Sequence, residues 1–255
     1  MPTFASGGTN IAFDDLGPRD TQNIIVLVHG FATNRKENWQ RLGWYGVFER
    51  KRFRTIALDC RGHGESGKPK GSSAYSHDAM VGDILSLMDH LDIKSADLMG
   101  YSMGARLSLA AALRSPDRFR HVVLGGIGGR LLEPPSGGFS MVDAMEAESP
   151  DSIADPLLRS FRHFADEQGE DRHALAALSR AGFQFVDLEA ACTNLRVPVL
   201  VVAGARDMLA GDPKKLADAF ANGKAVTLPG CDHFSAIPHG LFKAAVFDFL
   251  EDTPD

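Results

Sequence analysis

A serine set between glycines is the feature of this sequence with the clearest chemical meaning. Ser102 stands in the motif Gly-Tyr-Ser-Met-Gly at residues 100–104, between an apolar run that predicts a buried strand and a stretch with helical periodicity. Flanking glycines permit a tight turn in which larger side chains would clash, and such a turn lifts the hydroxyl out of the sheet. The N–H of Met103 then lies at a helix start, where backbone donors favour a developing negative charge. The motif predicts a nucleophilic serine with Met103 as an oxyanion donor.

A serine hydroxyl becomes a strong nucleophile beside a base that a third group orients, so a histidine and a carboxylate are required. Among nine histidines, His233 follows the last predicted strand, and Asp207 follows the strand before it. Both fall at the carboxyl ends of strands, the edge where the serine turn emerges. Asp212 precedes a proline and is favoured as a helix N-cap, and Asp232 adjoins the histidine and normally points to the opposite side. We predict Ser102, Asp207 and His233 as the catalytic residues.

The elements that must position these residues alternate along the chain. Short β-branched runs separated by helical patterns predict an α/β fold with a mostly parallel sheet covered on both faces. The expected strands lie at residues 24–28, 55–58, 96–100, 121–124, 197–203 and 225–228. The clearest helices are expected at about 76–91, 103–113 and 241–250.

The alternation stops between residues 129 and 194, where apolar residues recur at helical spacing without a strand-like run. We predict a small helical cap here, inserted after the sixth strand of a single domain whose core is 1–128 and 195–255. Its larger apolar side chains either wall an acyl pocket or only hold the cap together, and the sequence leaves both open. The pocket candidates are Phe139, Met141, Met145, Phe161, Phe164, Phe183 and Phe185.

Composition narrows the class of protein. The 255 residues are 44% hydrophobic, enough for a sizeable core, and the net charge of −6 argues against nucleic acid or an anionic membrane as partner. Three cysteines without Cys-x-x-Cys spacing indicate free thiols in a reducing compartment. No signal peptide and no apolar run of about 20 residues is apparent, so we expect a cytoplasmic protein. No cluster has metal-ligand spacing, and we predict neither a metal nor another cofactor.

Five motifs in order resemble the α/β-hydrolase superfamily and, more narrowly, its capped esterase, lactonase and haloperoxidase-like branch. They are H-G-F at 29–31, D-C-R-G-H-G-E-S at 59–66, G-Y-S-M-G at 100–104, G-A-R-D at 204–207 and G-C-D-H at 230–233. The resemblance implies an eight-stranded sheet flanked by helices and an acyl-serine intermediate hydrolysed by water. It also implies that Phe31 donates the second oxyanion N–H. For His29 and His63, hydrogen bonds that brace loops are favoured over proton transfer.

The resulting hypothesis is hydrolysis of a carboxylic ester with a small or medium, mostly apolar acyl part. Two other reactions use the same triad: hydrolysis of a C–C bond in a diketone or dienoate, and cofactor-free perhydrolysis seen as haloperoxidase activity. A basic cap pocket would favour the first, and Arg159, Arg162 and Arg180 leave that open. A non-enzymatic alternative is a signalling receptor that binds a small ligand under the cap. The expected partner is a small-molecule ester, and the oligomeric state is not predicted.

Overall fold

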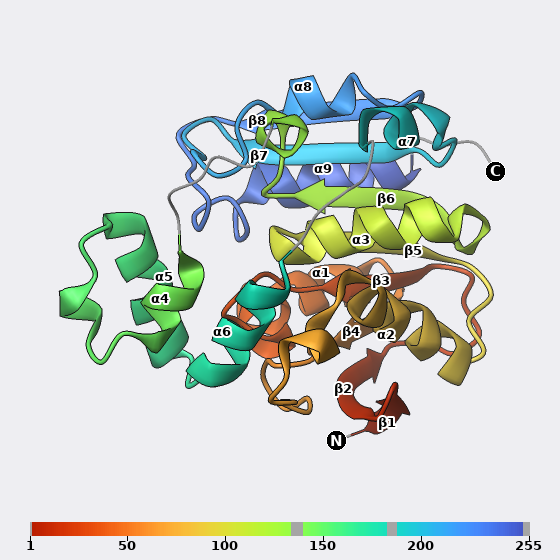
Figure 1. Cartoon of the computed structure of the whole chain (residues 1–255). Helices are drawn as coiled ribbons and strands as arrows, with labels where there is room; N and C mark the ends of the chain where they lie inside the picture. The colour runs from red at the N-terminus through yellow and green to blue at the C-terminus, as the bar shows by residue number, and fades with distance from the viewer. Residues whose placement is uncertain (1, 134–139, 183–187, 252–255) are drawn as a thin grey trace.

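The core of the protein is a sheet of eight strands in the order β1-β2-β4-β3-β5-β6-β7-β8 (Figure 1). The computed structural model describes residues 2–133, 140–182 and 188–251. The strands are β1 (Thr3–Ser6), β2 (Thr9–Leu16), β3 (Ile24–Val28), β4 (Arg54–Leu58), β5 (Ala96–Tyr101), β6 (Phe119–Gly125), β7 (Val199–Gly204) and β8 (Gly223–Leu228). β2 pairs antiparallel with β1 and β4, and all other pairs are parallel. The predicted mostly parallel, eight-stranded sheet is confirmed.

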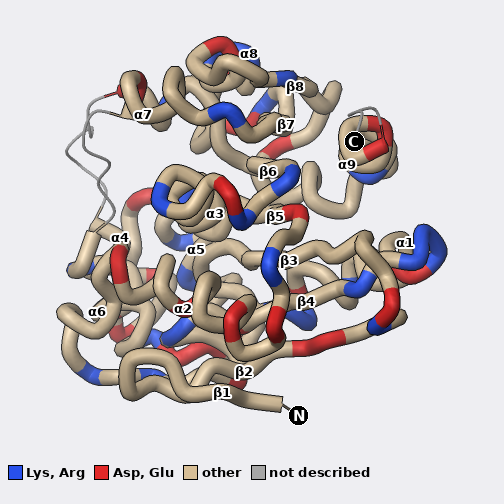
Figure 2. The backbone as a smooth tube through the Cα atoms, turned by 90° about the vertical axis from the view of Figure 1, so that its right-hand side faces the viewer, with Lys and Arg blue, Asp and Glu red and all other residues tan. Residues whose placement is uncertain are grey.

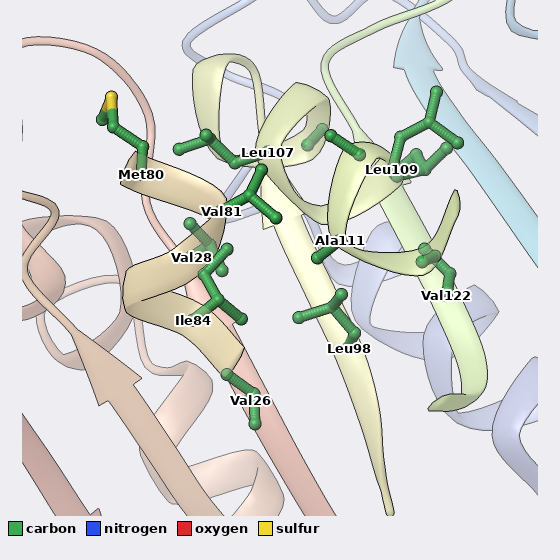
Figure 3. Packing of buried hydrophobic residues seen from close by; sticks show 14 of the residues in the cluster. Val26, Val28, Met80, Val81, Ile84, Leu98, Leu107, Leu109, Ala111 and Val122 are labelled. Carbon is green, nitrogen blue, oxygen red and sulfur yellow. The ribbon is translucent and has the colours of Figure 1, made fainter. Parts of the chain in front are cut away.

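Helices cover both faces because the central strands are apolar on both sides. In β3, Val26 and Val28 belong to the apolar cluster that contains α2 and α3 (Figure 3), whereas Ile25 and Leu27 pack on the opposite side. This alternation is the period of two expected for a strand. The first face carries α2 (His77–His90), α3 (Met103–Arg114), α7 (Leu188–Asn194) and α8 (Pro213–Ala217); the second carries α1 (Trp44–Arg50) and α9 (Gly240–Glu251).

Short helical turns complete the loops around this core. They are the π-helix η1 (Lys36–Gln40) and the 3-10 turns η2 (Ser72–Tyr75), η3 (Pro116–Arg118), η4 (Gly129–Leu132) and η5 (Pro150–Ser152). None of the helices in the three described ranges combines the length and the apolar composition that a bilayer-spanning helix needs.

The segment between β6 and β7 is helical, as expected for a cap. It contains α4 (Met141–Glu146), α5 (Pro156–Glu167) and α6 (Arg172–Ala181) before α7. Asp155 and Asp171 accept hydrogen bonds from the first turns of α5 and α6, which explains where these helices begin. The arrowhead of β6 points to the side of the molecule on which α4 and α5 lie (Figure 1). The cap therefore stands at the carboxyl edge of the sheet, where the predicted catalytic residues converge.

Charged residues of both signs are interspersed along the backbone (Figure 2). Most of those that are buried form close ion pairs: Arg61 lies 2.6 Å from Asp83, and Arg54 lies 2.9 Å from Asp15. A buried charge without such a partner destabilises the folded state. These pairs therefore keep the charges of the core compatible with its apolar surroundings.

Candidate active site

Ser102 lies in the sharp turn between β5 and α3, and the neighbouring glycines make that turn possible. The serine has φ 54° and ψ −113°, a backbone conformation that non-glycine residues rarely adopt. A Cβ on Gly104 would lie 2.0 Å from the carbonyl oxygen of Val28, and one on Gly100 would lie 2.2 Å from the carbonyl oxygen of Gly104. No side chain fits at either position. The strained serine conformation is therefore imposed by close backbone packing of β3, β5 and α3.

The structure brings the three predicted residues together at one edge of the sheet. His233, in the loop after β8, has its Nε2 3.0 Å from the Ser102 hydroxyl oxygen. Its Nδ1 lies 2.8 Å from Oδ2 of Asp207, which follows β7. The Nδ1–H donates to the carboxylate, so Nε2 is left as the acceptor that faces the serine. A Cβ on Gly204 would lie 2.3 Å from the carbonyl oxygen of Cys231, so this glycine lets the two loops approach.

The carboxylate of Asp207 is itself held in place. Its Oδ1 accepts hydrogen bonds from the N–H groups of Leu209 and Ala210, each at 3.0 Å, which leaves Oδ2 for the histidine. The competing carboxylates are engaged elsewhere. Asp212 caps α8, as predicted. Asp232 closes an exposed turn, where hydrogen bonds from the Ser235 hydroxyl and N–H lower its pKa.

Two aromatic residues at the site were not singled out from the sequence. The buried Tyr101 donates from its hydroxyl to the carbonyl oxygen of His233 at 2.6 Å, and burial raises its pKa well above the usual range. The hydroxyl therefore stays protonated and holds the histidine loop. Phe234 packs edge-on against the ring of His233 with centroids 5.6 Å apart. The signal that could have found both is adjacency, since each is the chain neighbour of a predicted catalytic residue.

The predicted oxyanion donors belong to the start of α3 and to a loop held by buried side chains. Met103 is the first residue of α3, so its N–H is one of the donors that a helix leaves without an internal partner. Phe31 belongs to a loop braced by two fully buried histidines: Nε2 of His29 accepts from Cys60 N–H at 2.9 Å, and Nε2 of His63 accepts from Ala32 N–H at 3.2 Å. Desolvation lowers their pKa values to about 4 and about 3. Both rings are therefore neutral braces, as the sequence indicated.

A cavity of about 450 Å³ opens over Ser102 and His233. Its apolar wall includes Phe161 and Phe164 of α5, and Phe234, whose ring centroid lies 5.7 Å from each of these two. Its further lining residues are Gly30, Phe31, Thr33, Glu37, Asn38, Arg41, Leu42, Tyr101, Glu167, Gln168 and Ile237.

The pocket candidates in the cap are divided by the structure. Phe161 and Phe164 line the cavity. Met141 and Met145 do not line it; they lie with Leu175 in the apolar cluster that holds the cap together, to which the two phenylalanines also belong. Phe139, Phe183 and Phe185 lie outside the described residues.

No set of three or more His, Cys, Asp or Glu side chains in the described parts of the chain is arranged to hold a metal ion. The three cysteines, Cys60, Cys192 and Cys231, are buried free thiols. The hydrogen-bonded series Asp207–His233–Ser102 is an arrangement suited to acyl transfer.

Comparisons with known proteins agree with this geometry. A family model described as the alpha/beta hydrolase fold matches residues 23–173. The 2-hydroxymuconate semialdehyde hydrolase of Pseudomonas sp. (strain CF600) is 29% identical over 225 residues, which cover 79% of this chain and 78% of that protein. An epoxide hydrolase of Caballeronia sordidicola is 37% identical over 98 residues, only 38% of this chain and 29% of that protein. The crystal structure of the enol-lactonase from Burkholderia xenovorans LB400 superposes with a TM-score of 0.76 at 28% identity and covers 98% of this chain and 100% of that one. This chain belongs to the alpha/beta-hydrolase fold family and is a hydrolase.

Proposed function

We propose that this protein hydrolyses a carboxylic ester with a small or medium, mostly apolar acyl part through an acyl-serine intermediate. The observation that carries the proposal is the chain of hydrogen bonds from Asp207 through His233 to Ser102, at 2.8 and 3.0 Å, beside an aromatic-walled cavity. A relay of this kind converts an unreactive hydroxyl into a nucleophile.

Each residue of the proposed site has its own role in the reaction. Ser102 attacks the ester carbonyl while Nε2 of His233 takes the hydroxyl proton, and Asp207 stabilises the imidazolium that forms. The N–H groups of Met103 and Phe31 stabilise the negative charge on the carbonyl oxygen. The imidazolium then returns the proton to the departing alkoxide. Water attacks the acyl-serine in the second half of the reaction, with His233 again acting as base.

The aromatic part of the cavity wall favours a neutral, apolar substrate over a carboxylate-bearing diketone or dienoate, because the arginine that lines the cavity, Arg41, is paired with Glu37 at 2.9 Å. The three cap arginines considered from the sequence are engaged elsewhere: Arg159 donates to the carbonyl oxygen of Ile153, Arg162 pairs with Asp166, and Arg180 pairs with Glu146. The aromatic wall suits a planar or aliphatic group. The enol-lactonase neighbour is named for a cyclic ester, which also favours ester cleavage.

The name of one relative supports a second candidate function. One is named as a hydrolase of 2-hydroxymuconate semialdehyde, so hydrolysis of a C–C bond remains the alternative for this site. Perhydrolysis and a receptor function would use the same cavity. The buried free cysteines support our proposal that the protein works in a reducing, cytoplasmic compartment.

The test combines active-site labelling with a substrate panel. A fluorophosphonate should label Ser102, and Ser102→Ala should lose both the label and the hydrolysis of p-nitrophenyl esters. Ser160→Ala, which changes an exposed serine of α5, serves as the matched control and should retain both. The panel should contain acetyl, butyryl and phenylacetyl esters, lactones and a dienoate. Faster turnover of the dienoate than of every ester, or esterase activity that survives in Ser102→Ala, would overturn the proposal.

A further inference from the structure

A buried carboxylate of the cap contacts the core at residues 29–35, the loop between β3 and η1 that carries Phe31 and is here called the oxyanion loop. Glu170, between α5 and α6, is only 7% exposed. Its Oε1 accepts a hydrogen bond from the side-chain amide of Asn34 at 3.0 Å, and its Oε2 accepts one from the N–H of Gly64 at 2.8 Å. These contacts join the cap to two core loops that are distant in sequence. No residue of the proposed triad takes part in them.

The first contact leads to the wall of the cavity. The Oδ1 of Asn34 accepts from the N–H groups of Lys36 and Glu37, and so caps η1. From η1, Asn38 accepts a hydrogen bond from the N–H of Gly30 at 3.2 Å, one residue before Phe31. A displacement of Glu170 would therefore also displace η1, which lines the cavity and holds the oxyanion loop through Asn38.

The second contact leads back to the same loop. Gly64 has φ +48°, and a Cβ there would lie 2.3 Å from Oδ2 of Asp59, so the two are closely packed. The Glu65 N–H donates to that Oδ2 at 2.8 Å, and the Arg35 N–H donates to Oδ1 at 2.8 Å. The two hydrogen-bonded paths from Glu170 therefore reach adjacent residues, Asn34 and Arg35, at the end of the oxyanion loop.

The charge of Glu170 is handled differently from other buried charges. Glu170 forms no salt bridge with any residue that the structure describes. Other buried charged side chains do form one, among them Arg35, Arg54, Arg61, Asp83, Asp97 and Arg162. Both of its donors are neutral, and burial raises its pKa. A buried carboxylate of this kind costs stability. Stability therefore does not explain why a carboxylate is present at this position. The two hydrogen bonds that it accepts do offer a reason.

We propose that Glu170 is a positioning residue through which the docked cap sets the geometry of the oxyanion loop and of η1. The proposal rests on the proposed esterase function, because it assigns Glu170 an effect on the oxyanion formed during ester cleavage. Phe31 also contacts the cap directly, with its ring centroid 6.2 Å from that of Phe161. Removing the Glu170 contacts should therefore leave Phe31 near the cap but misplace its N–H.

A swap of donor and acceptor tests this arrangement. Glu170→Gln keeps an acceptor for Gly64 but turns a second donor toward the Asn34 amide. Asn34→Asp keeps the cap of η1 but sets a carboxylate against Glu170. In the double variant, the new amide can donate to the new carboxylate while still accepting from Gly64, so the bonding pattern returns with its direction reversed. Glu148→Gln, at an exposed carboxylate of the cap, is the matched control.

Turnover of p-nitrophenyl acetate is the first readout, because its acetyl group is too small to depend on the apolar wall of the cap. Each single variant should lower kcat by about tenfold or more, with KM changed less, and the double variant should recover most of that loss. Affinity for a trifluoromethyl ketone, whose adduct places an oxyanion in the hole, should fall and recover in parallel. Circular dichroism and thermal unfolding of every variant restrict the comparison to folded protein.

The outcomes separate this inference from the proposed function. Folded single variants with wild-type kcat and ketone affinity would overturn it while leaving the esterase proposal standing. A double variant as impaired as the single variants would also overturn it. Wild-type protein that neither hydrolyses the acetate nor reacts with fluorophosphonate would overturn the proposed function itself.

Discussion

At the scale of single residues, the site depends on positions where no side chain is tolerated. Ser102 holds an unfavourable backbone conformation only because the strands and the helix around it pack with direct backbone contact. The sequence motif indicates that contact without giving its distance. The structure supplies the reason: a methyl group on Gly104 would overlap the Val28 carbonyl.

We expect Gly104→Ala to lower the free energy of unfolding by about 3 kcal/mol or more, because the backbone must shift to admit the methyl group. The fluorophosphonate label on Ser102 should be lost with it. Gly82→Ala in α2 is the control, since nothing lies within 4 Å of its added Cβ, and it should stabilise the protein by about 0.5–1 kcal/mol. Urea unfolding measures both. Equal effects of the two substitutions would contradict this account of the turn.

The buried histidines His29 and His63 should make the protein sensitive to acid. Their folded-state pKa values, about 4 and about 3, lie below the ordinary value of 6.5. The stability that comes from keeping them neutral is fully present above pH 6.5 and is lost as the pH falls toward 4 and below. One pKa unit corresponds to about 1.4 kcal/mol, so protonating His29 costs on the order of 3 kcal/mol.

Urea unfolding at several pH values checks this. His63→Gln retains an acceptor for the Ala32 N–H, and its stability should fall less steeply than that of the wild type between pH 6.5 and 4. His173→Gln, at an exposed position of the cap, should keep the wild-type slope. A steep slope that persists in His63→Gln would assign the acid sensitivity to other groups.

At the scale of elements, the sequence predicted the parts whose apolar pattern is set by burial on both faces. β3 to β8 were expected at nearly their observed positions, and so were α2, α3 and α9. β1 and β2 were not individually identified. β2 lies near an edge of the sheet, where part of the strand is exposed, and it carries Asn10, Asp14 and Asp15 among its apolar residues. The apolar run that predicts a buried strand is therefore interrupted.

In the cap, the sequence predicted the helices but not which of their side chains line the cavity. Helical spacing predicts that a side chain faces an apolar environment, but a packed cluster and a ligand cavity present the same pattern. Met145 of α4 and Phe164 of α5 therefore looked equivalent, although only the second lines the cavity. The difference depends on how the helices are docked, which is a tertiary property.

Phe164 gives a test of that difference. Phe164→Ala should lower kcat/KM for a phenylacetyl ester by about tenfold relative to an acetyl ester, because it removes apolar contact area from the cavity wall. Met141→Ala changes a cap residue that lies in the apolar cluster, and should lower the stability without altering the ratio between the two esters. A ratio that changes equally in both variants would contradict the assigned pocket wall.

At the scale of the whole molecule, three apolar clusters are arranged in a fixed relation. Two lie on opposite faces of the sheet, and the third joins α4, α5 and one side of α6 and meets the core at Ala32 and Leu209. The other side of α6, with Ala174, Ala177 and Leu178, belongs to the large cluster on the first face of the sheet. The site lies where the sheet and the third cluster meet. The core strands therefore belong to large clusters, whereas α4 and α5 of the cap are stabilised by a smaller one.

Hydrogen exchange should reveal this division. Amides of β5 and β6 should exchange only through global unfolding, whereas amides of α5 should exchange through a smaller, local opening of the cap. A phosphonate with a benzyl group, bound to Ser102, would pack in the cavity against Phe161, Phe164 and Phe234 and stabilise the docked cap. Exchange of α5 should then slow by about tenfold or more, the ratio that corresponds to about 1.4 kcal/mol of contact energy. α9, on the far side of the sheet, should keep its rate. Slowing of α9 to the same degree would mean that the cap and the core open as one cooperative unit.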